Sequence, residues 1–242
     1  MDEAIKKPNV LLTLLEVRAL AEFGLFCLVW PALTKAPSGD GHTVLIIPGF
    51  GVGDTATVPL RYYLRGLGYD AQGWGLGLNL GTNARVRQKL VQRLEALRQS
   101  SGRKVSLIGW SLGGVFAREL ARKFPHHVRL VITLGAPFTG NPQANNLLSL
   151  SQLFTGKKFT QQDRDAFEKR QAPPPVPTTA IHSRSDGIIA WQCSLEQESL
   201  QTENIEVSSS HFGLVHNPQV AHIIADRLAQ KEDDWQPFKR NT

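Results

Sequence analysis

Short apolar runs alternate along most of the chain with stretches in which apolar residues recur at helical spacing. The apolar runs predict strands at 43–50, 69–75, 104–110, 128–137, 178–183 and 204–209. The stretches of helical spacing predict helices at 58–68, 83–99, 112–124 and 217–230. The last of these helices has Asn217 in place for an N-cap and Pro218 at its first position.

Strands that alternate with helices predict an α/β fold, with a mostly parallel sheet of about six strands and helices on both faces. Residues 138–177 break the alternation with an amphipathic piece, a charged piece and the proline run PPPVP. This segment is too long for a simple connection. We therefore expect a main domain over residues 41–242, with a cap or lid inserted at 138–177.

Residues 1–40 form an apolar N-terminal segment and a linker rich in turn-forming residues, TKAPSGDG. Glu16, Arg18 and Glu22 interrupt the apolar stretch, so its longest uncharged run is shorter than a bilayer span of about 20 residues. The charges also fit a signal peptide poorly. We expect a helix packed onto the domain, and the alternative is an interfacial helix in peripheral contact with lipid.

The composition and charge argue against a nucleic-acid-binding protein and against a metal or nucleotide site. The net charge of +6 on 242 residues is modest, and no aromatic stripe accompanies the basic residues, so we expect no nucleic-acid partner. Cys27 and Cys193 stand far apart and belong to no metal-ligand pattern, and no nucleotide-binding loop is evident. We expect no metal, no cofactor and a cytoplasmic location with membrane association as an option.

The sequence GWSLGG at 109–114 joins a predicted strand to a predicted helix. Strand, G-x-S-x-G and helix in this order form a nucleophile elbow, in which a sharp turn lifts a serine hydroxyl out at the carboxyl end of the sheet. The glycines leave room where larger side chains would collide. Ser111 is therefore the predicted nucleophile.

A serine hydroxyl needs a base, and the base needs an acid to orient it. Asp186 follows the predicted strand 178–183, and His211 follows the predicted strand 204–209. This is the order Ser, Asp, His expected after an elbow. His216 is an alternative base, but the start of the last helix would disfavour its charged form. Taken alone, Asp186 before Gly187 also fits a simple turn aspartate.

An acyl-transfer site also needs two donors for the developing oxyanion. One donor is expected to be the backbone N–H of Leu112, the residue after the nucleophile. The other is expected from the loop PGFGVGD after the first strand, with Phe50 N–H as the donor and Gly51 as a nearby alternative.

These motifs make the chain similar to the α/β-hydrolases over residues 43 to about 230. More closely, it resembles bacterial esterases and lipases with LPGF-type oxyanion loops, here IIPGFGVGD, and a GWGLG segment at 73–77. We expect the first two antiparallel strands of that fold to be missing here, with the N-terminal helix in their place. The oxyanion loop reads Pro-Gly where many relatives read His-Gly. The resemblance implies hydrolysis of carboxylic esters through an acyl-enzyme.

Apolar residues at the same end of the sheet are candidates for a substrate-binding pocket. They are Trp110, Leu76, Leu78 and Phe138, together with Phe50 and Leu112. The expected substrate is a small-molecule ester with a short or medium acyl chain, which includes acylglycerols. An acyltransferase or thioesterase with the same three residues is the alternative, and a non-catalytic binding module is a third reading.

Overall fold

The computed structural model describes residues 5–81, 84–139 and 171–239. Most of the predicted cap at 138–177 lies outside these residues. The division into an N-terminal segment 1–40 and a main domain 41–242 stays a prediction.

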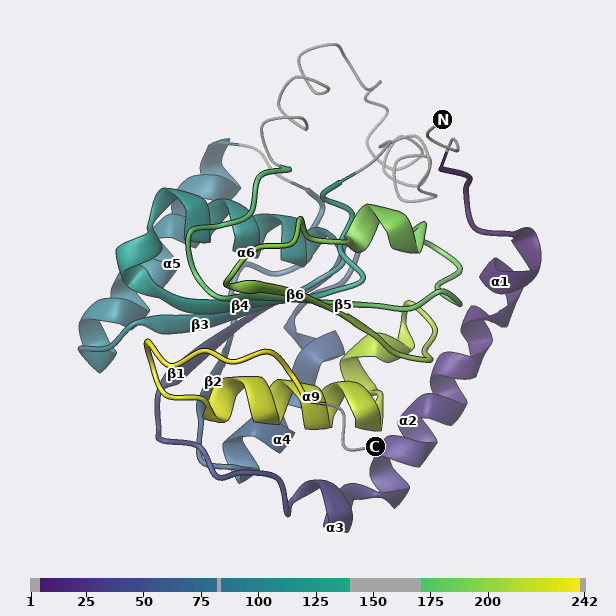
Figure 1. Cartoon of the computed structure of the whole chain (residues 1–242), viewed down its shortest axis with the longest axis horizontal. Coiled ribbons are helices and arrows are strands. Elements are labelled where there is room, and N and C mark those ends of the chain that lie inside the picture. The colour runs from purple at the N-terminus through teal and green to yellow at the C-terminus, as the bar shows by residue number, and fades with distance from the viewer. Residues whose placement is uncertain (1–4, 82–83, 140–170, 240–242) are drawn as a thin grey trace.

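Six parallel strands form one open sheet in the described part of the chain (Figure 1). The spatial order is β2-β1-β3-β4-β5-β6. The strands are β1 (Thr43–Ile47), β2 (Asp70–Gly73), β3 (Val105–Trp110), β4 (Val128–Leu134), β5 (Thr178–His182) and β6 (Thr202–Glu206). All their carboxyl ends lie at one edge of the sheet, where ligands bind in folds of this kind.

The predicted strands are all present, and the central ones match best because they are buried on both faces. Every residue of β1, β3 and β4 is buried, and their near-continuous apolar runs are typical of covered parallel strands. The prediction for β6 was wrong in its position, since the strand begins at Thr202 and ends at Glu206. This strand lies at the edge of the sheet and begins with the polar residues Thr202, Glu203 and Asn204, which hides its start.

Helices cover both faces of the sheet (Figure 1). On one face, α5 (Ala84–Ser101) and α6 (Leu112–Lys123) pack on side chains such as Leu45 and Leu107. On the other face, α4 (Val58–Gly66) and α9 (Pro218–Ala229) pack on side chains such as Val44 and Ile108. Short 3-10 turns lie after β1, β5 and β6: η2 (Asp54–Thr57), η5 (Trp191–Ser194) and η6 (Gly213–His216). A further 3-10 turn, η3 (Pro125–His127), joins α6 to β4.

The start of α9 confirms Asn217 as the predicted N-cap of this helix. The Asn217 side chain accepts hydrogen bonds from the backbone N–H groups of Gln219 (2.8 Å) and Val220 (3.3 Å). Pro218 occupies the first helical position, where its missing N–H costs nothing.

The N-terminal segment runs along one side of the molecule as a chain of short helices (purple in Figure 1). These are α1 (Val10–Leu14), η1 (Leu15–Arg18), α2 (Ala19–Leu28) and α3 (Trp30–Leu33). Phe26 anchors the segment in the core, where its ring meets those of Trp30 and Tyr63 at 5.4 and 6.2 Å between centroids. No helix in the described residues is long and apolar enough to cross a membrane.

Candidate active site

The turn between β3 and α6 holds Ser111 in a backbone conformation that few L-residues adopt, with φ 53° and ψ −123°. The neighbouring glycines make the turn sterically feasible. A Cβ on Gly109 would lie 2.4 Å from the carbonyl oxygen of Gly113, and a Cβ on Gly113 would lie 2.2 Å from that of Ile47. The serine therefore sits on a strained and tightly packed turn, as the predicted elbow requires.

Asp186 and His211 lie in direct contact at the carboxyl ends of β5 and β6. The two atoms that meet are His211 Nδ1 and Asp186 Oδ2, at 2.7 Å, and both side chains are buried. The second carboxylate oxygen of Asp186 accepts hydrogen bonds from the backbone N–H groups of Ile188 (2.8 Å) and Ile189 (2.7 Å). With one oxygen fixed by the backbone, the other is held toward the imidazole. A proton on Nδ1 then leaves Nε2 as the basic nitrogen.

The elbow and the loop of His211 are connected through Trp110, the last residue of β3. The Trp110 indole Nε1 donates a hydrogen bond to the backbone carbonyl of His211 at 3.1 Å. Gly135 closes the arrangement after β4, at φ 54°, because a Cβ there would lie 3.1 Å from both Asp186 Oδ2 and His211 Nδ1. The fold thus gathers the loops that follow β3, β4, β5 and β6 around this pair.

The loop after β1, which carries the predicted oxyanion donor Phe50, is packed against the elbow. A Cβ on Gly49 would lie 3.3 Å from the Cβ of Ser111. The N–H of Gly51, the alternative donor, already donates to the carbonyl of Asn79 at 2.8 Å. This bond disfavours Gly51 as an oxyanion donor, while the roles of Phe50 and Leu112 stay predictions.

Two polar side chains fasten this loop to the segment after β2, and the sequence analysis missed both. Asn79 is fully buried, and its side-chain Nδ2 donates to the carbonyl of Pro48 at 2.8 Å. Asp54 accepts from the backbone N–H groups of Trp74 (2.9 Å) and Gly75 (3.0 Å). The GWGLG segment therefore serves as a support for the loop that precedes it in the chain.

The charged residues of the N-terminal segment reach the loops of Asp186 and His211. Glu16 is buried, and its Oε1 accepts from the backbone N–H groups of Gly187 (2.8 Å) and His211 (2.9 Å). Its Oε2 accepts from the backbone N–H of Phe212 at 3.0 Å. A single carboxylate thus bridges the loop of the acid and the loop of the base.

Glu22 and Arg18 extend this contact. Glu22 accepts hydrogen bonds from the backbone N–H of Ser210 (2.8 Å) and from the hydroxyl of Ser209 (2.9 Å). Arg18 donates to the backbone carbonyls of Ser185 and Ser209. No sequence signal marks these residues, because in the sequence they read only as charges that interrupt an apolar stretch.

The predicted substrate-binding residues fall into different environments. Trp110 and Phe138 are buried, and Phe138 lies under the guanidinium of Arg118, 3.8 Å from its ring centroid. Leu76 is partly buried, and Leu78 is exposed at 62%. Phe212, which the sequence analysis did not single out, adds an exposed ring beside His211. Contact of any of these residues with substrate stays a prediction.

His216, the alternative base, lies at the end of η6. Its ring packs edge-on against Phe23 at 5.4 Å between centroids, and burial lowers its pKa. Its Nδ1 has no hydrogen-bond partner in the described part of the chain. The contact with Asp186 therefore favours His211 as the base.

A second Ser–His–Asp arrangement lies at the opposite end of the sheet. His42 Nδ1 meets Asp40 Oδ1 at 2.5 Å, and His42 Nε2 lies 2.9 Å from the Ser106 hydroxyl. Ser106 is inside β3 and has no exposed surface, so no substrate can reach its oxygen. This arrangement differs from the candidate site because its serine lies inside a strand at the amino end of the sheet and not on a turn at the carboxyl edge, and it is a structural network.

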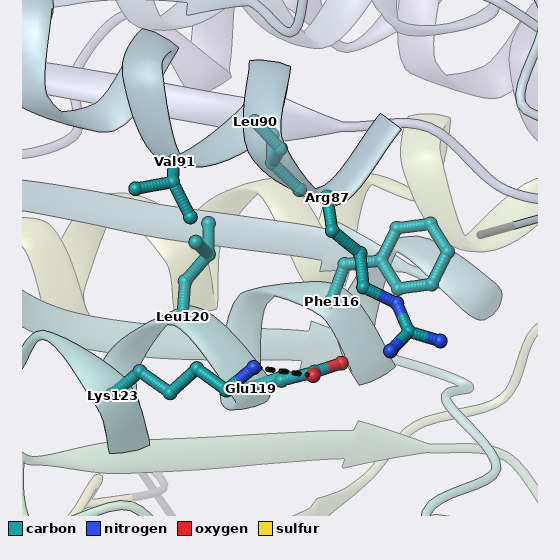
Figure 2. Close-up of a pocket in the computed structure, with 7 residues that line it drawn as sticks. All are labelled: Arg87, Leu90, Val91, Phe116, Glu119, Leu120 and Lys123. Atoms are coloured by element: carbon teal, nitrogen blue, oxygen red, sulfur yellow. Dashed lines mark hydrogen bonds and ion pairs between the residues drawn. The ribbon is translucent and has the colours of Figure 1, made fainter. Parts of the chain in front are cut away.

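A small cavity between α5 and α6 is separate from the candidate site (Figure 2). Apolar side chains form its floor and charged ones its rim, and Lys123 Nζ pairs with Glu119 Oε1 at 3.0 Å. The lining residues are Arg87, Leu90, Val91, Phe116, Glu119, Leu120 and Lys123. No serine, threonine, cysteine or histidine is among the described residues that line this cavity, so it offers no pair of nucleophile and base.

A parallel sheet with a serine elbow and an Asp–His pair at its carboxyl edge defines the class of the α/β-hydrolases. The family model for the alpha/beta hydrolase fold matches residues 27–174, so the chain belongs to this family. Membership supports hydrolase activity. No curated protein sequence matches the chain.

Solved structures of lipases share the fold. A lipase B of Aspergillus fumigatus is 18% identical with a TM-score of 0.64, over 80% of this chain and 54% of its own. The mature lipase of Bacillus licheniformis is 17% identical with a TM-score of 0.61, over 79% of this chain and 94% of its own. A monoacylglycerol lipase of Paleococcus ferrophilus is 15% identical with a TM-score of 0.55, over 78% and 96%. The chain thus spans about half of the Aspergillus lipase, and these likenesses show the fold alone.

Proposed function

We infer that this protein is a serine hydrolase that cleaves carboxylic esters through an acyl-enzyme on Ser111. The observation that carries the proposal is the buried contact of His211 Nδ1 with Asp186 Oδ2, at the same edge of the sheet as a serine held at φ 53°. A neutral imidazole in this tautomer presents Nε2 as a base.

In the proposed reaction His211 takes the proton of the Ser111 hydroxyl as its oxygen attacks the ester carbonyl. The backbone N–H groups of Leu112 and Phe50 stabilise the oxyanion, and His211 then returns the proton to the leaving alcohol. In the second half of the reaction His211 takes a proton from water, whose oxygen attacks the carbonyl of the acyl-enzyme. The proton then passes to the Ser111 oxygen, and the carboxylic acid is released. Asp186 stabilises the imidazolium through the short contact with Nδ1.

The expected substrates are apolar esters with short to medium acyl chains, a class that includes acylglycerols. Exposed apolar side chains near the loops support this, since Phe212 is 44% exposed beside His211 and Leu78 is 62% exposed beyond the GWGLG segment. An apolar acyl chain is stabilised by such surfaces, whereas a charged one is not.

Hydrolysis of p-nitrophenyl esters from acetate to palmitate tests the proposal, with purified wild-type, Ser111→Ala, His211→Ala and His126→Ala proteins. We expect activity that peaks at one chain length and falls at least about 1,000-fold in Ser111→Ala and His211→Ala. His126 is exposed on η3, so His126→Ala should match wild type. Full activity in Ser111→Ala would exclude the serine mechanism. Transfer to added alcohols that outpaces hydrolysis would identify an acyltransferase instead.

A further inference from the structure

The N-terminal segment has the opposite polarity to an ordinary surface helix. Its outward side carries large apolar side chains, with Val10, Leu20 and Leu28 exposed at 74%, 74% and 77% and Leu14 and Val17 at 69% and 67%. From Val10 to Ala32 no exposed residue is charged, and the Cys27 thiol is the only exposed polar group. An amphipathic helix on a water-exposed surface would turn these side chains toward the core.

The charges of the segment all face inward and cannot be turned out without loss. Glu16 and Glu22 accept hydrogen bonds from the loops of Asp186 and His211, and Arg18 donates to Ser185 and Ser209. These bonds fix the rotation of the segment about its axis. The apolar side is therefore presented outward as a permanent feature of the fold, and contiguous apolar surfaces of this kind mark interaction sites.

The exposed charges at the two ends of the segment indicate what covers it. Over residues 5–35 the exposed ionisable side chains are Lys6, Lys7 and Lys35, and all three are basic. An apolar face flanked by lysines is complementary to a bilayer that contains anionic headgroups. A second copy paired antiparallel across this face would bring Lys6 of each chain toward Lys35 of the other, and these like charges repel.

We propose that the outward face of residues 10–32 docks onto an anionic lipid surface. The segment lies flat on the headgroup region, its apolar side chains enter the acyl boundary, and the lysines contact the headgroups. The inward face holds the loops of Asp186 and His211, so docking brings the exposed ring of Phe212 and the candidate active site next to the lipid. The proposal concerns binding and stands whether or not Ser111 is catalytic.

Flotation of the full chain with vesicles tests the proposal. The vesicles are phosphatidylcholine alone, or phosphatidylcholine with phosphatidylglycerol. We compare wild type with a variant carrying Leu14→Ser, Leu20→Ser and Leu28→Ser, and with a matched control carrying Leu200→Ser and Val58→Ser. The control residues are exposed at 96% and 48% on other parts of the molecule. Thermal unfolding of each protein establishes that it is folded.

We expect wild type and the control to float with the vesicles that contain phosphatidylglycerol, and the triple variant to lose at least about tenfold in partitioning. Ser111→Ala should float like wild type, which separates this test from the proposed hydrolysis. Folded wild-type protein that does not float, or a triple variant that floats equally well, would overturn the proposal. So would a wild-type dimer that becomes a monomer in the triple variant without vesicle binding, because it would assign the face to a second copy.

Discussion

The Glu16 carboxylate accepts a hydrogen bond from the backbone N–H of His211 at 2.9 Å, across 195 residues of sequence. The same oxygen accepts from Gly187, the neighbour of Asp186, at 2.8 Å. The residue therefore positions the acid and the base relative to each other without touching either side chain. An arrangement that holds reacting groups in place contributes to rate as strongly as the groups themselves.

Replacement of Glu16 by alanine should lower both activity and stability. Three backbone N–H groups, two of them buried, lose their acceptor, which costs about 3 kcal/mol of unfolding free energy or more. We expect kcat on a soluble p-nitrophenyl ester to fall about 10- to 100-fold, with little change in KM, because the base is misplaced rather than the substrate. Glu16→Gln keeps one acceptor oxygen and should recover part of the loss.

The matched control for this experiment is Glu95→Ala, since Glu95 is exposed on α5. It should leave kcat at the value of wild type. It should change the free energy of unfolding by no more than about 0.5 kcal/mol. If Glu16→Ala lost stability but kept the kcat of wild type at a temperature where it is folded, a positioning role would be refuted and a purely structural one would remain.

Asn79 should matter to the rate through the loop that carries Phe50. Its side-chain amide donates to the carbonyl of Pro48 at 2.8 Å, and its own carbonyl accepts from Gly51. Asn79→Asp keeps the shape but removes the donor and places a carboxylate against a carbonyl oxygen. We expect kcat to fall about tenfold or more, with the larger effect on kcat than on KM, since the oxyanion forms only in the transition state. Steady-state kinetics of Asn79→Asp and Asn79→Ala would check this, and unchanged kcat in both would contradict it.

The sequence predicted the elements that buried apolar runs and helical spacing specify. Strands such as β1 and β3 are buried along their whole length, so their composition alone distinguishes them. The serine, the acid and the base were predicted as residues that follow strands, because parallel strands bring their carboxyl ends together. The structure brings Asp186 and His211 into contact, as that reasoning expects.

The supports of the site could not be predicted in this way. Glu16, Asp54 and Asn79 act through hydrogen bonds to backbone groups, and any segment offers the same N–H and C=O groups. Residue type and spacing therefore do not indicate which backbone groups these side chains will bind. The inverted polarity of the N-terminal segment has the same cause, since the pattern locates its apolar and charged residues but does not say which side faces the protein.

The network at the amino end of the sheet should make stability depend on pH. Burial lowers the pKa of His42 from its ordinary value of 6.5; Asp40 opposes this shift, and Arg129 and Arg103 reinforce it. The unfolded chain thus binds more protons than the folded protein near pH 6. The stability that the neutral imidazole contributes is fully present above about pH 6.5 and declines as the pH falls, by at most about 1.4 kcal/mol per unit.

Urea unfolding at about pH 7.5 and about pH 5.5 would measure this effect in wild type and in His42→Gln. We expect the free energy of unfolding of wild type to fall more steeply toward low pH than that of the variant. His216, whose pKa is also lowered by burial, contributes equally to both proteins and drops out of the comparison. Parallel pH dependences in the two proteins would show that His42 does not carry the effect.

Arg118 and Glu196 form a buried ion pair between α6 and the segment that precedes β6. The guanidinium donates to both carboxylate oxygens, and the two side chains are 2% and 0% exposed. Arg118 also donates to the carbonyls of Gln171 (3.1 Å) and Ala172 (3.3 Å) and lies over the ring of Phe138. It thus connects α6, the helix that begins after Ser111, to described residues near both ends of the predicted cap 138–177.

Removal of one partner should be far more damaging than replacement of both. Arg118→Ala leaves a buried carboxylate uncompensated, and we expect a loss of about 3–5 kcal/mol in the free energy of unfolding. Arg118→Met together with Glu196→Leu removes both charges, and we expect a clearly smaller loss in the free energy of unfolding. The reason is that the cost of desolvating two charges nearly equals the attraction between them. Urea unfolding of Arg118→Met, of Glu196→Leu and of the double variant gives the coupling energy between the two residues. A double variant as unstable as Arg118→Ala would mean that the bonds from Arg118 to Gln171 and Ala172, rather than the ion pair, carry its contribution.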